Sequence, residues 1–262
     1  GGVSLSATAV ILVLLIGAGL MAIGIKTGYP IATAFTVTGA VVGVGLALGG
    51  TPVWSKYIEI GAIWVLTPFV GGGIAFVLAS ILPRAAVPER FSVVALAGLV
   101  GAVLANVEFT GLGPGGTAGS ITALGRRTLG ADGIGVLVVL SLLVAFGVAS
   151  VVYWDVRRDE TGGLRRVLLA LGSLVAFSAG GSQVGLAVGP LLPLLDDVGV
   201  LSPLAVLLGG GLGILVGSWT GAPRMIKALA RDYSSLGPRR SISALVPSFL
   251  IAQLAVLLGV PV

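Results

Sequence analysis

The stretch VLLALGSLVAFSAGGSQVGLAVGPLLPLL, residues 167–195, decides the fold class. It carries no charged side chain, and it is longer than the roughly 20 apolar residues that an α-helix needs to cross a bilayer. Its centre, SAGGSQ at residues 178–183, is more polar and contains two adjacent glycines, which are poor helix formers. The stretch therefore predicts a long membrane span that is interrupted in its middle.

Comparable apolar stretches recur along the whole chain of 262 residues, of which 56% are hydrophobic and 10% charged. A soluble domain carries about a quarter charged residues. We therefore expect an all-α integral membrane protein with about eight transmembrane helices, some broken or re-entrant. The expected spans are residues 5–25, 29–48, 58–81, 91–107, 133–152, 167–195, 201–219 and 241–260. The second either crosses fully or re-enters, because it opens on Pro30 and is rich in glycine and threonine.

The residues that are absent exclude several functions. The chain has no cysteine and no histidine, so disulfides, thiolate metal sites and histidine-dependent catalysis are excluded. No nucleophile–base pair is visible, and we expect that the protein is not an enzyme.

The net charge of +5 comes from basic residues in short loops, where they set membrane orientation and do not indicate a nucleic-acid partner. Loops 83–90, 154–166 and 221–240 are expected to face the cytoplasm, and Arg126 and Arg127 are expected to be solvated loop charge. This pattern predicts a multi-pass protein of the plasma membrane.

The main candidate for substrate binding lies in residues 176–190. Adjacent Gly180 and Gly181 would free backbone N–H groups, and Ser178, Ser182 and Gln183 add side-chain donors. A half-helix that starts near Ser182 would direct the positive end of its dipole at an anion. The alternative is a glycine kink whose serine hydroxyls bond to the preceding turn.

A second candidate opens the stretch 28–39. Pro30 is expected at a helix start, and Thr33 and Thr36 share one helical face behind it. The alternative is a proline-initiated span whose hydroxyls are satisfied internally. The glycine-rich run 111–120 lacks the Lys-Ser/Thr ending of a phosphate-binding P-loop and is expected to be a flexible connector.

A short internal echo points to inverted repeats. GYPI at residues 28–31 recurs as GVPV at residues 259–262, each time after an apolar span. An odd number of spans between the copies would place them on opposite membrane faces, as in inverted-repeat secondary transporters. We therefore divide the chain into a first-repeat portion (1–107), a connecting region with one span and a charged loop (108–166), and a second-repeat portion (167–262).

Several motifs resemble those of the inorganic phosphate transporter (PiT) family. Residues 177–190 read FSAGGSQVGLAVGP where that family carries FSHGANDVANAIGP, and residues 221–227 are similar to its basic loop of type G-x-R-x-I-K. Residues 28–45 are similar to its GLPVSTTH motif, and residues 64–68 to the W-V-x-x-P that follows. Relative to that pattern, the chain is expected to be truncated at both ends.

The resemblance implies a secondary transporter of inorganic phosphate, with sodium or a proton as the coupling ion and no other cofactor. The chain departs from the pattern at decisive polar positions. Ser182 and Gln183 stand where the family has Asn-Asp, and Phe35 stands where it has His. The alternatives are a carrier of another oxyanion such as sulfate, and a non-transporting membrane sensor or scaffold. The expected partners are a small inorganic anion and the lipid bilayer, and a homo-oligomer stays open.

Overall fold

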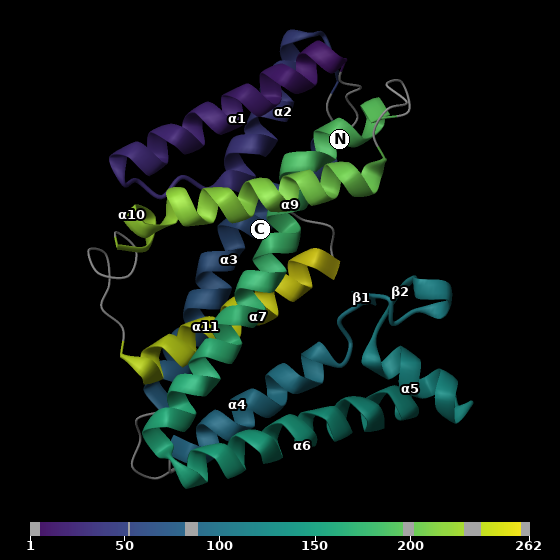
Figure 1. The fold of residues 1–262 in the computed structure, drawn as a ribbon, viewed down its shortest axis with the longest axis vertical. Coiled ribbons are helices and arrows are strands. Elements are labelled where there is room, and N and C mark those ends of the chain that lie inside the picture. The colour runs from purple at the N-terminus through teal and green to yellow at the C-terminus, as the bar shows by residue number, and fades with distance from the viewer. Residues whose placement is uncertain (1–5, 52, 82–88, 196–201, 228–236, 258–262) are drawn as a thin grey trace. The chain divides into compact units, whose positions relative to one another are not determined.

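The computed structural model describes all residues except 1–5, 52, 82–88, 196–201, 228–236 and 258–262 (Figure 1). The described chain is almost entirely helical. Its elements, in chain order, are α1 (Ala7–Thr27), α2 (Thr33–Ala47), α3 (Trp54–Ile81), α4 (Glu89–Leu104), β1 (Phe109–Thr110), η1 (Pro114–Gly116), β2 (Ala118–Gly119), α5 (Ile121–Leu129), α6 (Ile134–Arg158), α7 (Glu160–Val188), η2 (Gly189–Leu194), α9 (Pro203–Thr220), α10 (Ala222–Lys227) and α11 (Pro238–Leu257).

The apolar helices confirm the predicted membrane fold. Among the described residues, 5 helices are long and apolar enough to cross a membrane, namely α1, α3, α6, α7 with its extension, and α9. Three shorter apolar helices lie at Thr33–Ala47, Arg90–Leu104 and Arg240–Ala255. The five and the three together correspond to the eight predicted spans.

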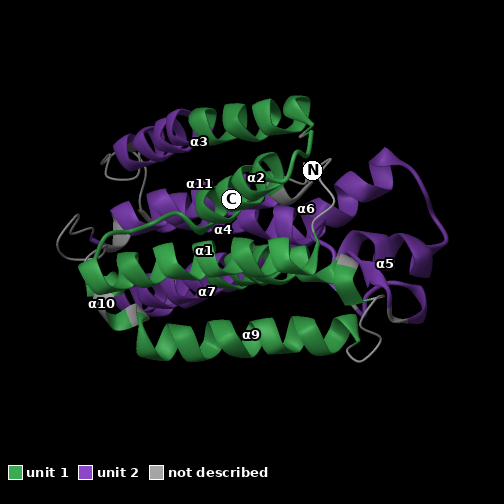
Figure 2. Ribbon diagram, turned by 90° about the horizontal axis from the view of Figure 1, so that it is seen from above, with its two compact units in different colours: residues 1–66, 176–236, 255–262 green, residues 67–175, 237–254 purple. Residues whose placement is uncertain are grey.

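The chain forms two compact units, and each is discontinuous in sequence (Figure 2). Unit 1 comprises Gly1–Leu66, Ala176–Leu236 and Ala255–Val262, and unit 2 comprises Thr67–Val175 and Gly237–Leu254. Helices α3 and α7 pass from one unit to the other along their length. The predicted division of the chain into repeat portions, with boundaries at residues 107 and 166, concerns how the sequence arose and not which residues pack together. It stays a prediction.

Unit 2 is built on close packing of α4 against α6. Gly101 makes this possible, because a Cβ at that position would lie 2.9 Å from Val148 Cγ2. A cluster of buried side chains from α4, α7 and α11 forms the core of this unit: Val93, Leu96, Val100, Val167, Leu171, Ile242, Val246 and Phe249. Small residues at such contacts let membrane helices approach closely.

In unit 1, α2 packs against α1. The segment between them turns at Gly28, whose φ of 77° suits glycine, and then runs back over Gly24. A Cβ at Gly24 would lie 2.9 Å from the Tyr29 carbonyl oxygen and 3.0 Å from Ile31 Cγ1. Helix α2 has 15 residues and a rise of about 22 Å, which is shorter than the hydrocarbon core of about 30 Å. This length favours a re-entrant α2 over a full crossing.

The charged run 154–166, predicted as a loop, is helical. Helix α6 continues to Arg158, α7 begins at Glu160, and Asp159 alone links them. Asp159 Oδ1 accepts a hydrogen bond from the Gly162 amide at 3.0 Å, and Arg166 Nε donates to Asp155 Oδ2 at 2.8 Å. The charged residues therefore cap and connect two helices, which is why hydropathy alone failed to place these ends.

The glycine-rich run 111–120, expected to be a flexible connector, is also folded. Strands β1 and β2 pair antiparallel, with Phe109 opposite Gly119, and α5 follows them. Gly113 and Gly119 pack backbone to backbone in this hairpin, where a Cβ on Gly119 would lie 2.8 Å from the Gly113 nitrogen. The glycines that suggested flexibility instead permit a close backbone approach.

Candidate functional site

The two stretches predicted to bind substrate belong to the same compact unit. Residues 176–190 form the second half of α7 and the start of η2, and residues 28–39 form the turn before α2 and its first half. Both lie in unit 1, coloured green in Figure 2. Among the described residues, α2 packs mainly on α1 and makes no extended contact with α7. The structure therefore places the two stretches in one body without joining them into one pocket.

The predicted helix break at residues 178–183 is wrong. Helix α7 runs without interruption from Glu160 to Val188, and the chain tightens into a 3₁₀ turn only at Gly189. A glycine in a helix costs about 1 kcal/mol, whereas a backbone group left unsatisfied in a bilayer costs several. The helical hydrogen bonds therefore prevail over the Gly180–Gly181 pair, and the backbone N–H groups of this stretch are not free for a ligand.

What this part of α7 presents is a set of neutral side chains. Ser178 and Ser182 lie one turn apart on one face, and both are half-buried, as is Gln183. Ser178 has an interaction partner, whereas the side chains of Ser182 and Gln183 hydrogen-bond to none of the described residues. Half-buried polar groups normally find partners. Ser182 and Gln183 are therefore the donors best placed to meet a ligand.

The adjacent glycines leave space beside these donors. A Cβ at Gly180 or Gly181 would meet none of the described residues within 4 Å, and the same is true at Gly185. Most of the contacts that require a glycine lie elsewhere, for example at Gly210, where a Cβ would lie 2.7 Å from Val188 Cγ2. The open face of Gly180 and Gly181 is accessible to a ligand of small size.

In the second stretch, residues 28–39, the threonine hydroxyls contact other atoms of the chain. Pro30, expected at a helix start, instead lies in the extended link before Ala32, and α2 begins at Thr33. The link is extended because it carries Ile31 back onto α1. Thr36 Oγ1 donates to the Ala32 carbonyl oxygen at 3.0 Å, and Thr33 Oγ1 lies 3.6 Å from Met21 Sδ. This is the internally satisfied arrangement named as the alternative.

The start of α2 nevertheless keeps backbone donors. Its N-cap residue, Ala32, offers no side-chain acceptor. By contrast, the N-cap serines of α1, α5 and α9 accept hydrogen bonds from the amides of Ala9, Ala123 and Ala205. The first N–H groups of a helix have no intrahelical partner, and they favour negative charge.

Two grooves in unit 1 are apolar and do not suit an oxyanion. One, of ≈ 480 Å³ between α1 and α2, has Thr36 as its only hydroxyl-bearing residue, and that hydroxyl is already bonded to a carbonyl. The other, of ≈ 580 Å³ between α1, η2 and α9, is lined by alanine, valine, leucine, isoleucine and glycine. An anion would lose its hydration there without gaining donors.

Phe35 forms an aromatic contact at the start of α2. Its ring centroid lies 4.1 Å from that of Trp64 in α3, and the rings are tilted by 54°. Phe35, which stands where the family pattern has histidine, is therefore part of an apolar contact. Among the described residues no group of three or more acidic, cysteine or histidine side chains could hold a metal ion.

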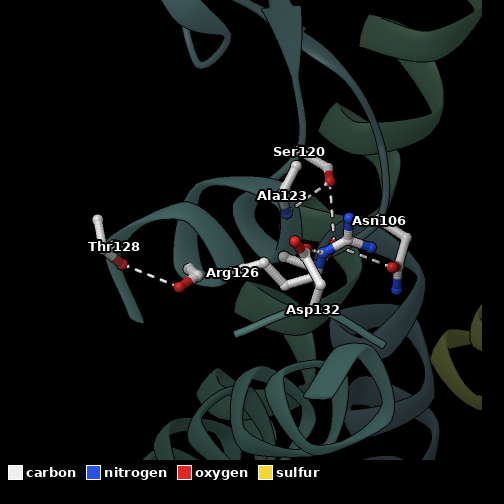
Figure 3. A network of polar contacts seen from close by, with 8 residues as sticks. Asn106, Ser120, Ala123, Arg126, Thr128 and Asp132 are labelled. Atoms are coloured by element: carbon white, nitrogen blue, oxygen red, sulfur yellow. Dashed lines mark hydrogen bonds and ion pairs between the residues drawn. The ribbon is translucent and has the colours of Figure 1, made fainter. Parts of the chain in front are cut away.

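Unit 2 contains a polar network that the sequence did not predict (Figure 3). Ser120 Oγ and Thr122 Oγ1 are 3.0 Å apart, and Thr122 Oγ1 donates to Asn106 Oδ1 at 3.1 Å. Thr122 is 2% exposed and Ser120 8%, so the network is buried at these two residues, in a region expected to be a connector. The pattern S-x-T after a glycine-rich run is the only sequence signal, and it is too common to be diagnostic.

Arg126 belongs to the same region and is not simply solvated charge. Its Nε atom is shielded from solvent and lies 3.3 Å from Asp132 Oδ1. Arg127, the next residue, is exposed as expected.

The apolar helices and the neutral polar stretches on them define a polytopic α-helical membrane protein. The family model described as "Phosphate transporter family" matches residues 3–262. The chain therefore belongs to the phosphate transporter family, as its motifs predicted.

Relatives and a solved structure agree with this assignment. The chain is 26% identical to a candidate phosphate permease of Chlamydia pneumoniae, over 90% of this chain and 62% of the relative. It is 25% identical to a candidate phosphate permease of Pyrococcus horikoshii, over 92% of this chain and 62% of the relative. It is 35% identical to human sodium-dependent phosphate transporter 1 over 94 residues, which are 33% of this chain and 14% of that protein.

The fold is similar to a solved structure titled "The sodium-dependent phosphate transporter". The TM-score is 0.68 at 22% identity, covering 97% of this chain and 66% of that chain. At this identity the match shows the fold. The chain spans 62% of the length of the two permeases.

Proposed function

We propose that the protein moves inorganic phosphate across the plasma membrane as a secondary transporter. The observation that carries this proposal is the family match along residues 3–262. The half-buried side chains of Ser182 and Gln183 support it, because they hydrogen-bond to none of the described residues and supply neutral donors in the stretch that resembles a family signature.

In this proposal the ligand is held by side chains of α7, since its backbone is fully helical. Ser178, Ser182 and Gln183 face the anion, and the small Gly180 and Gly181 let it approach the helix. The free N–H groups at the start of α2, around Thr33, provide a second donor set when the carrier brings the stretches together. The protein acts as a carrier in this scheme and not as an enzyme.

The coupling ion is sodium or a proton in this proposal, and one relative is named sodium-dependent. Neither α2 nor residues 167–188 contain a carboxylate. A cation bound beside them would be balanced by the charge of the phosphate itself and ligated by neutral oxygens, because an uncompensated charge in the membrane is costly. Coupling and phosphate binding would then be mutually dependent.

The test is uptake of radiolabelled phosphate into liposomes that contain the full-length protein, with and without a sodium or proton gradient. Gln183→Ala should raise KM about tenfold or more, since a hydrogen bond to a charged group is worth about 1.5–3 kcal/mol. Gln253→Ala, which changes the same residue type in α11, is the matched control and should leave KM unchanged.

Sulfate and a membrane sensor are the competing outcomes. Sulfate uptake that phosphate does not compete with would assign the chain to another oxyanion. Absence of any saturable uptake, from protein that stays folded and monodisperse, would contradict transport and favour a sensor.

A further inference from the structure

The starts of α4, α7 and α11 and the end of α6 lie together at one end of unit 2 (Figure 1). The rings of Phe91 and Tyr153 stack at 6.1 Å, which joins α4 to α6. Val93, Val167 and Ile242 share one buried cluster, which joins α4, α7 and α11. Because these are ends of apolar helices, this end lies at the boundary between membrane and water.

The end carries an excess of exposed positive charge. Besides Arg166, five exposed arginines are described there, and we call them the arginine rim: Arg90, Arg157, Arg158, Arg165 and Arg240. The carboxylates of Asp155 and Asp159 lie 2.8 and 3.7 Å from nitrogens of Arg166, so this sixth arginine offsets one of their two negative charges. Glu160 is the remaining acidic side chain among those described at this end. The rim therefore keeps a net positive charge.

Aromatic rings lie among these arginines. The guanidinium carbon of Arg158 is 3.4 Å from the ring centroid of Trp154, and that of Arg90 is 5.2 Å from the ring of Phe91. Trp154 is 57% exposed and Phe91 47% exposed. A guanidinium stacked on a ring keeps its N–H groups at the edge, where they can bind phosphate oxygens in pairs. Exposed aromatic side chains at this depth are typical of the lipid headgroup level.

We propose that the arginine rim binds the headgroups of anionic phospholipids. A free phosphate ion needs converging donors in a pocket, whereas this positive charge is spread over four helix ends on an exposed surface. Clusters of about four to eight basic residues beside membrane helices attract the headgroups of anionic lipids. The surface is distinct from Ser182 and Gln183, which lie in unit 1.

The test uses the full-length protein in nanodiscs, with tryptophan fluorescence quenched by brominated phosphatidylglycerol or brominated phosphatidylcholine. Trp154→Phe supplies the background of the other three tryptophans, since the chain has 4. We expect phosphatidylglycerol at equal mole fraction to quench Trp154 at least about threefold more effectively, and added salt to reduce the difference.

Two double variants separate the rim from overall charge. Arg90→Gln with Arg165→Gln should abolish most of the preference, and Arg90→Lys with Arg165→Lys should retain part of it. The matched control is Arg127→Gln with Lys56→Gln, which removes equal charge from exposed side chains elsewhere, and it should retain the full preference. Arg158 is left unchanged because it contacts the reporter ring.

Equal quenching by the two lipids would overturn the proposal. It would also be overturned if the lipid preference fell equally in the Arg90→Gln/Arg165→Gln variant and in the Arg127→Gln/Lys56→Gln control. Loss of the preference when inorganic phosphate replaces chloride at constant ionic strength would assign the arginines to free phosphate and would also overturn it. None of these results depends on phosphate uptake.

Discussion

The side-chain amide of Asn106 donates a hydrogen bond to Ser141 Oγ over 2.9 Å, although the residues are 35 positions apart. Ser141 Oγ in turn donates to the Leu137 carbonyl oxygen at 2.8 Å. Asn106 also accepts from Thr122, whose hydroxyl contacts Ser120. The network ties the hairpin and α5 to the ends of α4 and α6, so a region that reads as a linker is a fixed part of unit 2.

Thr122→Val should destabilise unit 2, because it keeps the shape of the side chain and removes its hydrogen bonds. Thr122 is 2% exposed, and the substitution removes its two hydrogen bonds, to Ser120 and Asn106, each worth about 0.5–1.5 kcal/mol. The apparent Tm of the detergent-solubilised protein should fall by several degrees. Thr128→Val on the same helix is the control, because Thr128 is exposed and, among the described residues, its hydroxyl bonds only to the nearby Gly125 carbonyl. An equal Tm for both variants would contradict an energetic role for the network.

Gly101→Ala should separate α4 from α6. The added Cβ would lie 2.9 Å from Val148 Cγ2 and 3.3 Å from Ala145 Cα, and overpacking of this kind costs about 1–3 kcal/mol. Gly147→Ala on α6 adds the same methyl where the described residues leave open space, and it should be neutral or stabilising by up to about 1 kcal/mol. Thermal unfolding of the two variants side by side measures the difference. Two similar midpoints would refute close packing at Gly101.

Gly181→Ala should leave the protein folded and slightly more stable, by up to about 1 kcal/mol. Residue 181 lies inside an unbroken helix, where alanine is favoured, and its Cβ would meet none of the described residues. If the chain broke at this position, alanine would instead be strained. A lowered Tm would therefore revive the half-helix interpretation. Uptake should decrease even as stability rises, because the methyl group narrows the approach to Ser182 and Gln183.

Ser182→Asn combined with Gln183→Asp should increase sodium dependence of uptake. It restores the Asn-Asp pair of the family motif and supplies a carboxylate that can balance a bound cation. The half-saturating sodium concentration should fall about tenfold. Ser182→Asn with Gln183→Asn is the matched control, since it is similar in volume but uncharged. If the two double variants have the same half-saturating sodium concentration, the coupling ion is bound elsewhere.

Much of the architecture follows from hydropathy alone. Every backbone group in a bilayer must be satisfied within its own segment, so a long uncharged stretch such as 167–195 has no alternative to a helix. The family could also be predicted, because FSAGGSQVGLAVGP keeps the order and spacing of the PiT motif around substituted polar residues. The copy at residues 259–262 lies outside the described residues, so the proposed repeat relation stays a prediction.

Local sequence determined which segments enter the membrane and where their polar residues fall, since apolar length and charge are properties of the segment itself. Tertiary structure decided what those polar residues do. It kept α7 helical through Gly180 and Gly181, because breaking the helical hydrogen bonds in a membrane costs more free energy than two glycines in a helix. It turned Thr36 onto a carbonyl, and it joined Asn106 to Ser141. Each of these outcomes depends on hydrogen-bond partners and packing in three dimensions, which residue type and spacing do not specify.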